Sequence, residues 1–460
     1  MQLDSRGLEI TTASADAVRH LDAAVADYLD YGQTASAEVK AALDADPDCA
    51  LAQCYRGYLL MMLENRAVLP KVQQALDALA GMADDLTPRE RLHAEALQAW
   101  VKGDLMNACL AWEAILNDWP RDVMALKLHH TMAFYTGRAH VLRSVVSGVL
   151  GEWDDTIPNY ANVQGMYAYA LEECGDYAEA ERWGREATDR NPGDLWAIHS
   201  VAHVLEMQGR ASEGAKWLDQ PPERWANKNF FKAHVWWHGA LFHFAQENFD
   251  EVFRIFDEVL TTVNSDKYVD VSNQAALLKR LEIAGLDVGD RWDALAEHSQ
   301  TRIHDHILPF RDAHFCLALA ADGRVDMARK QIDSLFVFAR EGDGWTAETT
   351  KSILIPLCEA IIAYESRRIR QGLRPDLADP QRAVADRRQP CPARSLRPDP
   401  HRLPRCAASG SAWRAPCCRS AWRSFPARGA TGRSSRKSST ISAKPTARPT
   451  RACACRPPPT

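Results

Sequence analysis

The sequence has no uninterrupted apolar run that approaches the roughly 18 residues needed to span a bilayer. Its first residues, Met1 to Arg6, lack the apolar core of a secretory signal. It also lacks a disulfide framework, because the cysteines before residue 367 are scattered singly in apolar surroundings, where a free thiol behaves as a small core side chain. We therefore expect a cytoplasmic protein with no membrane partner. The cysteines concerned are Cys49, Cys54, Cys109, Cys174, Cys316 and Cys358.

Basic residues are scarce in most of the chain. Residues 1–366 carry 33 basic and 57 acidic side chains, whereas residues 367–460 carry 22 basic and 4 acidic ones. The overall formal charge of −6 is therefore a cancellation between two opposite regions. Because neutralising phosphates requires clustered Lys and Arg on a folded surface, the acidic region argues against nucleic acid as a partner.

Common catalytic signatures are absent as well. The sequence has no glycine-rich phosphate loop of the Walker or Rossmann type, no His-Glu-x-x-His and no recognisable nucleophile–base motif. We therefore expect no cofactor and assign no catalytic residue.

What the sequence does contain is a repeated spacing. A small residue is followed by an alanine 12 residues later, an apolar residue 7 after that and a proline 5 further on. This is the skeleton of the tetratricopeptide repeat, a helix-turn-helix unit of about 34 residues. Its small residues let two helices touch, and its proline ends the pair. The three copies are Ala23, Ala35, Ala42 and Pro47; Ala96, Ala108, Ile115 and Pro120; and Ala168, Ala180, Ala187 and Pro192.

Local signals extend this pattern along the chain. A turn at Gly175-Asp176-Tyr177 divides residues 161–192 into two helices, and Thr87-Pro88-Arg89-Glu90 has the composition of a capping box. Degenerate units surround Gly137, Gly209, Asn248 and Gly323. Residues 1–366 thus predict an all-α fold, a right-handed α-solenoid of roughly seven to nine tetratricopeptide-like helix pairs.

Residues 367–460 form a second region, in which helical periodicity ends and Arg, Pro, Ser and Cys dominate. Such a composition is typical of a disordered basic tail. A shifted reading frame is a second interpretation, because GC-rich codons read one nucleotide further on after Ser366 give an amphipathic helical string to about residue 403. We predict a frameshifted tail that does not pack on the repeats and leaves an apolar face exposed on the helix Ser352 to Tyr364.

Histidines are concentrated on the predicted first helices of the pairs, which line the concave groove of such repeats. His199, His203 and Glu206 share one helical face. An imidazole pair at i and i+4 can chelate a divalent ion, with Glu206 or His234 as a third ligand. Alternatively, these histidines pack between helices or contact a ligand. The candidate groove residues are His93, His130, Tyr167, His199, His203, Glu206, His234, His238, His306 and His314.

Several strings outside the generic repeat consensus resemble the tetratricopeptide repeat protein 38 family over most of residues 1–366. The resemblance implies an all-helical repeat protein of uncharacterised biochemical role, and it supplies no catalytic residue. Gly239 departs from the family, which tends to have Trp there. The matching strings are Arg89-Glu90-Arg91-Leu92-His93, Ala125-Leu126-Lys127, Val201-Ala202-His203-Val204, Glu206-Met207, Trp237-His238, Asp305-His306-Ile307-Leu308 and Asp312-Ala313-His314-Phe315.

The function expected from these features is that of an interaction scaffold. A stack of helix pairs presents a continuous groove that can hold a peptide or a partner helix, and aromatic and imidazole side chains offer stacking and hydrogen bonding. The alternative is a metal-dependent, hydrolase-like enzyme that uses the groove histidines.

Overall fold

The computed structural model describes residues 1–219, 225–261 and 268–370. All described residues belong to one compact unit. The predicted boundary after residue 366 and both interpretations of the basic tail concern residues 367–460. Nearly all of that region lies outside the described residues, so those statements stay predictions.

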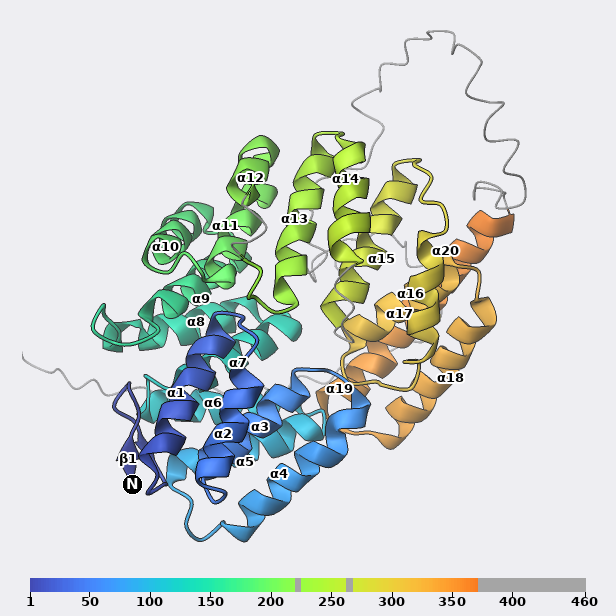
Figure 1. Ribbon diagram of the computed structural model, residues 1–460. Coiled ribbons are helices and arrows are strands. Elements are labelled where there is room, and N and C mark those ends of the chain that lie inside the picture. The colour runs from blue at the N-terminus through green and yellow to red at the C-terminus, as the bar shows by residue number, and fades with distance from the viewer. Residues whose placement is uncertain (220–224, 262–267, 371–460) are drawn as a thin grey trace, which may run out of the picture. The chain divides into compact units, whose positions relative to one another are not determined.

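Helices make up almost all of the regular structure in the described part of the chain, as the sequence predicted (Figure 1). Each helix is followed by a short turn and a second helix that packs on it, the arrangement of an α-solenoid of tetratricopeptide-like pairs. The pairs up to residue 190 are α1 (Ala15–Leu29) with α2 (Ala35–Ala45), α3 (Ala50–Met61) with α4 (Leu69–Gly81), α5 (Pro88–Val101) with α6 (Leu105–Asp118), α7 (Val123–Tyr135) with α8 (Ala139–Val149), and α9 (Tyr160–Glu173) with α10 (Tyr177–Arg190).

The later pairs continue the pattern. Within the described ranges nine consecutive pairs are present, in agreement with the expected seven to nine. Short 3₁₀ turns η1 (Arg66–Val68) and η2 (Leu150–Glu152) and a π-helical turn η4 (Phe256–Leu260) extend individual helices. The remaining pairs are α11 (Leu195–Met207) with α12 (Ala211–Leu218), α13 (Phe231–Ala245) with α14 (Phe249–Ile255), α15 (Tyr268–Ile283) with α16 (Arg291–Gln300), and α17 (Pro309–Ala321) with α18 (Val325–Glu341).

The turn between two paired helices requires a left-handed residue. In the clearest unit this residue is Gly175 (φ 86°), whose N–H donates to the carbonyl of Glu172 at 2.8 Å and so ends α9. The predicted capping box at the start of α5 is also confirmed, since Thr87 and Glu90 each accept from the backbone N–H of the other. Local sequence signals therefore determine where these helices begin and end.

The small residues of the repeat skeleton lie where helices cross, with one exception. Ala168, Ala180 and Ala187 are fully buried between α9, α10 and their neighbours. In the first copy, however, Ala23 is exposed and Ala24 occupies the buried position. The first position of that copy was wrong by one residue, because the buried stripe of α1 runs through Leu21, Ala24 and Val25, whereas Ala35 and Ala42 are buried as predicted.

A final helix has no partner after it within the described residues. It runs from α19 (Gly344–Thr349) through the π-helical turn η5 (Thr350–Leu354) into α20 (Ile355–Arg370), and it packs on α17 and α18. Ile353, Leu357 and Tyr364 are 55, 41 and 51% exposed. The helix therefore carries the exposed apolar face that was expected of residues 352–364.

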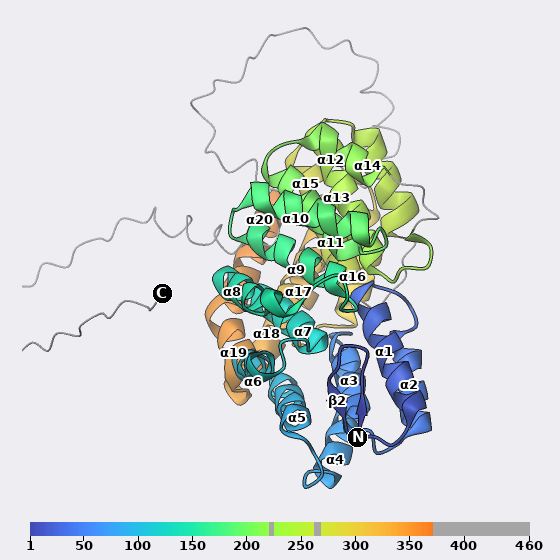
Figure 2. The ribbon, with the colours of Figure 1, turned by 90° about the vertical axis from the view of Figure 1, so that its left-hand side faces the viewer.

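Segments far apart in sequence also meet. Phe231, which begins α13, stacks on Tyr31 at a centroid distance of 4.2 Å, and the N–H of Thr346 donates to Gly103 O at 3.1 Å. Figure 2 shows α19 beside α6, in agreement with that contact. An N-terminal hairpin of β1 (Gln2–Leu3) and β2 (Glu9–Ile10), with Gln2 paired to Ile10, precedes the first helix pair. No helix in the described ranges combines the length and the apolarity that crossing a membrane requires.

Gly214 marks a close approach between α12 and α13. A Cβ atom at this position would lie 2.3 Å from the ring of the buried Phe242, whereas one at Gly148 in α8 would meet nothing within 4 Å. We expect Gly214→Ala to destabilise the protein by about 1–3 kcal/mol through overpacking, although alanine is the better helix former. The matched change Gly148→Ala should stabilise it by up to about 1 kcal/mol. Urea unfolding of the two variants checks this, and equal stabilities would contradict the close approach.

Candidate functional site

Four histidines from two neighbouring first helices meet inside the protein. His199 and His203 lie one turn apart on α11, and His234 and His238 lie one turn apart on α13. Their side chains face one another because α11 and α13 pack together, with ring centroids 4.2 to 5.0 Å apart. None of the four is more than 3% exposed, and one nitrogen from each lies within 4.8 Å of the others. We refer to this group as the histidine cluster.

Three of the four rings are oriented by oxygen atoms outside the cluster. His238 Nδ1 lies 2.8 Å from Glu206 Oε2, His234 Nδ1 lies 3.0 Å from Asn273 Oδ1, and His203 Nδ1 lies 3.5 Å from Glu172 Oε2. An oxygen acceptor at Nδ1 selects the tautomer that carries its proton there. The Nε2 atoms of the neutral His234 and His238 rings are therefore lone-pair acceptors.

The inner nitrogens of the cluster are poorly satisfied. His199 Nε2 lies 3.0 Å from His234 Nε2, which makes His199 the donor to the lone pair of His234. Three further nitrogens of the cluster are buried and have no hydrogen-bond partner among the described residues. They are His199 Nδ1, His203 Nε2 and His238 Nε2. A buried polar atom without a partner costs about 1–3 kcal/mol, so an arrangement with three of them calls for an explanation.

Burial controls the protonation of the cluster. Together with the neighbouring imidazoles, burial holds the pKa values of His199, His234 and His238 well below the usual range, so these rings are neutral at pH 7. Burial also opposes protonation of His203, but its bond to Glu172 and the nearby carboxylate charges outweigh it and raise its pKa. Burial raises the pKa of Glu206 to about 7.

A cavity of about 300 Å³ lies beside the cluster, and His199 and His234 form part of its wall. Most of the wall is aromatic or aliphatic, with Trp196 packed 5.5 Å from Phe231. One amine enters it, since Lys127 Nζ lies 3.9 Å from the ring centroid of Trp196 and donates to Tyr31 Oη at 3.0 Å. Burial lowers the pKa of Lys127, although the negative charge of Asp194 acts to raise it.

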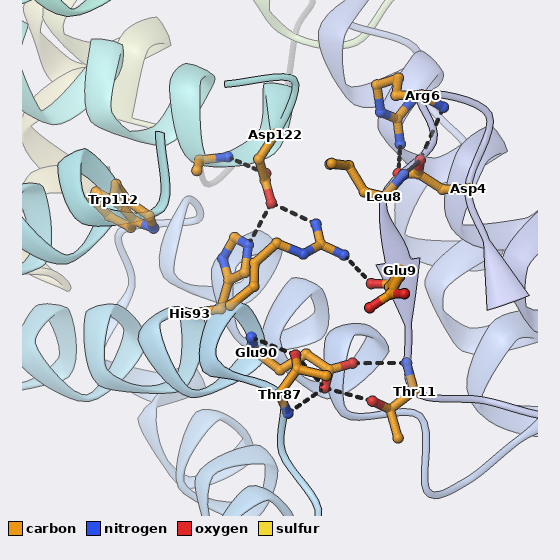
Figure 3. A network of polar contacts seen from close by, with 12 residues as sticks. Asp4, Arg6, Leu8, Glu9, Thr11, Thr87, Glu90, His93, Trp112 and Asp122 are labelled. Atoms are coloured by element: carbon orange, nitrogen blue, oxygen red, sulfur yellow. Dashed lines mark hydrogen bonds and ion pairs between the residues drawn. The ribbon is translucent and has the colours of Figure 1, made fainter. Parts of the chain in front are cut away.

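His93 lies in a separate buried network that joins α5 to α3 and α7 (Figure 3). Its Nε2 is 3.0 Å from Asp122 Oδ2 and its Nδ1 is 3.1 Å from Tyr58 Oη. The same Asp122 oxygen accepts from Arg89 Nη1 at 2.7 Å, while its other oxygen caps α7 at Ala125 N. His93 is fully buried and is satisfied by these contacts, so its surroundings are those of a structural residue.

The other candidate groove residues do not join the cluster. His130 is buried between Tyr169 and Trp196, and Tyr167 packs edge-on against Trp183. His314 on α17 bonds the carbonyl of Phe310 within its own helix. The assignment of His306 to a first helix was wrong, because it lies in the turn before α17 with φ 51°, a conformation that no helix interior adopts.

Sequence reasoning thus located the pairs that form the cluster but not its surroundings. Glu206 was considered as a metal ligand, whereas the structure places it behind His238, where it accepts from Nδ1. Glu172, Asn273 and the cavity were not anticipated. One signal was available for Lys127, because a lysine within the apolar string Val123–Leu128 is unusual unless it is buried for a reason.

Comparison with known proteins finds solved structures that resemble parts of this chain. No family model matches the chain. Among solved structures, the apo form of RapI aligns at 12% identity over 78% of this chain and 99% of that chain, with a TM-score of 0.39. Yeast Tom70 aligns at 11% identity over 80% and 91%, with a TM-score of 0.32. The TPR domain of P58(IPK) aligns at 15% identity over 78% and 99%, with a TM-score of 0.18. The chain is similar to each of these in part.

Proposed function

We propose that this protein is a helical-repeat interaction protein that binds a peptide by receiving an apolar or aromatic side chain in the cavity beside the histidine cluster. The cavity is the observation that carries this proposal. Its size falls at the lower end of the range for ligand pockets, and its aromatic wall with a few polar groups is the usual composition of such a pocket. A buried aromatic or aliphatic anchor is also what supplies most of the energy in peptide recognition.

The polar groups of the wall suggest how the peptide would be oriented. Lys127 lines the cavity and donates one hydrogen bond to Tyr31, and its amine has further hydrogens that can donate to a peptide carbonyl. Of the candidate groove residues, His199 and His234 line the cavity directly. The remaining groove residues would contribute by holding first helices in place, which is how we now interpret His93 and His130.

Two further expectations from the sequence belong with this proposal. We infer membership of the tetratricopeptide repeat protein 38 family and a cytoplasmic location, the latter supported by free cysteines that lie mostly buried. A metal-dependent, hydrolase-like enzyme remains the alternative proposal. It would require a metal ion at the histidine cluster and a nucleophile in the cavity wall.

The test uses peptides selected from a random phage library on the wild-type protein. Leu59 lines the cavity from α3, and Leu59→Trp would fill part of it. We expect this variant to weaken binding of the selected peptides at least about tenfold, because about 1.4 kcal/mol of anchor burial is enough for that change. Isothermal titration calorimetry measures the affinity. The control is Trp183→Ala on α10, which removes a partly buried tryptophan that does not line the cavity.

The outcomes separate the alternatives. Peptides that bind both variants equally well would place the peptide site elsewhere and refute the proposal. Failure to select any peptide, together with thermal stabilisation by a small aromatic compound that Leu59→Trp abolishes, would show a small-molecule pocket instead. Circular dichroism before each titration confirms that the variants are folded.

A further inference from the structure

We propose that His199, His203, His234 and His238 form a binding site for one divalent transition-metal ion of the zinc class. The four side chains come from two packed helices at matching i and i+4 positions, so two rigid elements position the whole set. Helix-borne ligands of this kind are held more precisely than ligands on loops.

The nitrogen atoms of the cluster lie close enough together to approach one ion. One nitrogen from each histidine lies within 4.8 Å of the others, and the closest pair, His199 Nε2 and His234 Nε2, is 3.0 Å apart. Nitrogens bound to zinc at about 2.0–2.1 Å lie about 3.3 Å apart in a tetrahedron. The separations in the cluster are therefore close to those that four nitrogens around one ion require.

Oxygen atoms outside the cluster lie at Nδ1 of three of its rings. Histidines that bind metals usually donate their other ring N–H to a carboxylate or a carbonyl oxygen, which fixes the tautomer and points the lone pair at the ion. His203, His234 and His238 each have such an oxygen at Nδ1, provided by Glu172, Asn273 and Glu206. The structural His93 has oxygen partners at both ring nitrogens, whereas His203 and His238 have one only at Nδ1.

A metal ion would give partners to buried nitrogens that now have none. As a network of imidazoles alone, the cluster makes one bond between rings and leaves His203 Nε2 and His238 Nε2 buried without partners. A cation accepts those lone pairs, and the carboxylates of Glu172 and Glu206 offset part of its charge from the second layer. Binding would also require the proton of the neutral His199 ring to move from Nε2 to Nδ1, because only a nitrogen with a free lone pair coordinates.

The donor set indicates the class of ion. Four imidazoles without thiolate suit Zn²⁺, Cu²⁺, Ni²⁺ or Co²⁺, whereas Mg²⁺ and Ca²⁺ require mostly oxygen ligands. His199 and His234 also line the cavity, so the ion would lie at the cavity wall. The site differs from the ligand set expected from the sequence, in which Glu206 was a ligand and His238 was not.

The experiment uses the full chain without a polyhistidine tag. Protein stripped with a chelator and dialysed is titrated with Co²⁺, whose visible absorption reports nitrogen coordination, and then with Zn²⁺. Elemental analysis after gel filtration gives the stoichiometry. We expect about one ion per chain in the wild type and a loss of at least about 100-fold in affinity in the His203→Ala, His238→Ala double variant. The matched control is His243→Ala, a histidine of α13 that lies outside the cluster.

A second variant keeps the test decisive if the double variant does not fold. Glu206→Gln preserves all four ligands and should weaken metal binding about 10- to 100-fold, because it weakens the acceptor behind His238. Folded wild-type protein that takes up no Co²⁺ or Zn²⁺ at micromolar concentrations would overturn the proposal. Equal uptake by the wild type and a folded double variant would do the same.

Discussion

Replacing Asp122 by alanine should destabilise the protein by about 3–5 kcal/mol. Asp122 is almost completely buried, as is Arg89, whose guanidinium it holds at 2.7 Å. The variant would leave that guanidinium in the interior without its carboxylate, and it would remove the acceptor for His93 Nε2. It would also remove the cap that Asp122 provides at the start of α7. A buried charge that loses its partner is among the most destabilising changes known for single substitutions.

The matched control separates the buried ion pair from the cap. Asp104 caps α6 in the same way, by accepting from Asn107 N, but it forms no ion pair among the described residues. Asp104→Ala should therefore cost only about 1 kcal/mol. Urea unfolding at pH 7 measures both variants. If Asp122→Ala cost no more than Asp104→Ala, the buried network would contribute nothing beyond the cap.

Replacing Glu64 by glutamine should remove a pH dependence of stability between about pH 5 and 8. Burial raises the pKa of Glu64 to about 8, although the charge of Arg311 and a bond from Tyr135 act in the opposite direction. Glu64 is 3% exposed, and its backbone carbonyl accepts from Arg311, which belongs to α17. The carboxyl group therefore binds its proton more tightly in the folded protein than in the unfolded chain.

The sign of the effect follows from proton linkage. Where the folded state binds more protons than the unfolded state, stability falls as pH rises, and the loss is complete above the folded pKa of about 8. Glutamine mimics the protonated form. Relative to the wild type, Glu64→Gln should thus gain stability from pH 5 to pH 8, by up to about 4 kcal/mol.

Thermal and urea unfolding over this pH range check the prediction. The control is Glu247→Gln, since Glu247 has the same left-handed backbone (φ 58°, against 51° for Glu64) but an exposed side chain. It should show no change with pH relative to the wild type. A Glu64→Gln variant that tracks the wild type at every pH would mean that the carboxyl group is ionised in the folded protein.

Most of the fold could be predicted from the sequence, because a helix pair is specified by residues close to one another. The buried Ala168 and Ala180, the turn at Gly175 and the capping box at Thr87 all carry local signals. The register error at Ala23 arose because the repeat spacing was followed where α1 offers two adjacent alanines. The apolar stripe of the helix, which includes Leu21 and Val25, points to Ala24 instead.

The site was less predictable for the same reason. The i and i+4 spacing of His199 and His203 is visible in the sequence, but the contact of that pair with His234 and His238 depends on how α11 packs against α13. Asn273, which bonds His234, belongs to α15 and lies 39 residues after His234 in the sequence. The cavity depends on still more distant segments, since Tyr31 and Phe231 form part of one wall.

The contact between Tyr31 and Phe231 also matters before the protein is complete. In an open repeat array each pair is stabilised by its immediate neighbours, so folding can keep pace with synthesis. Here the stacking of Tyr31 on Phe231 can form only after α13 has been synthesised. At about 5–20 residues per second, some 200 residues of synthesis take roughly 10–40 s. During that interval the aromatic surface that will line the cavity lacks its α13 part, so we expect the nascent chain to be more prone to aggregation than the complete protein.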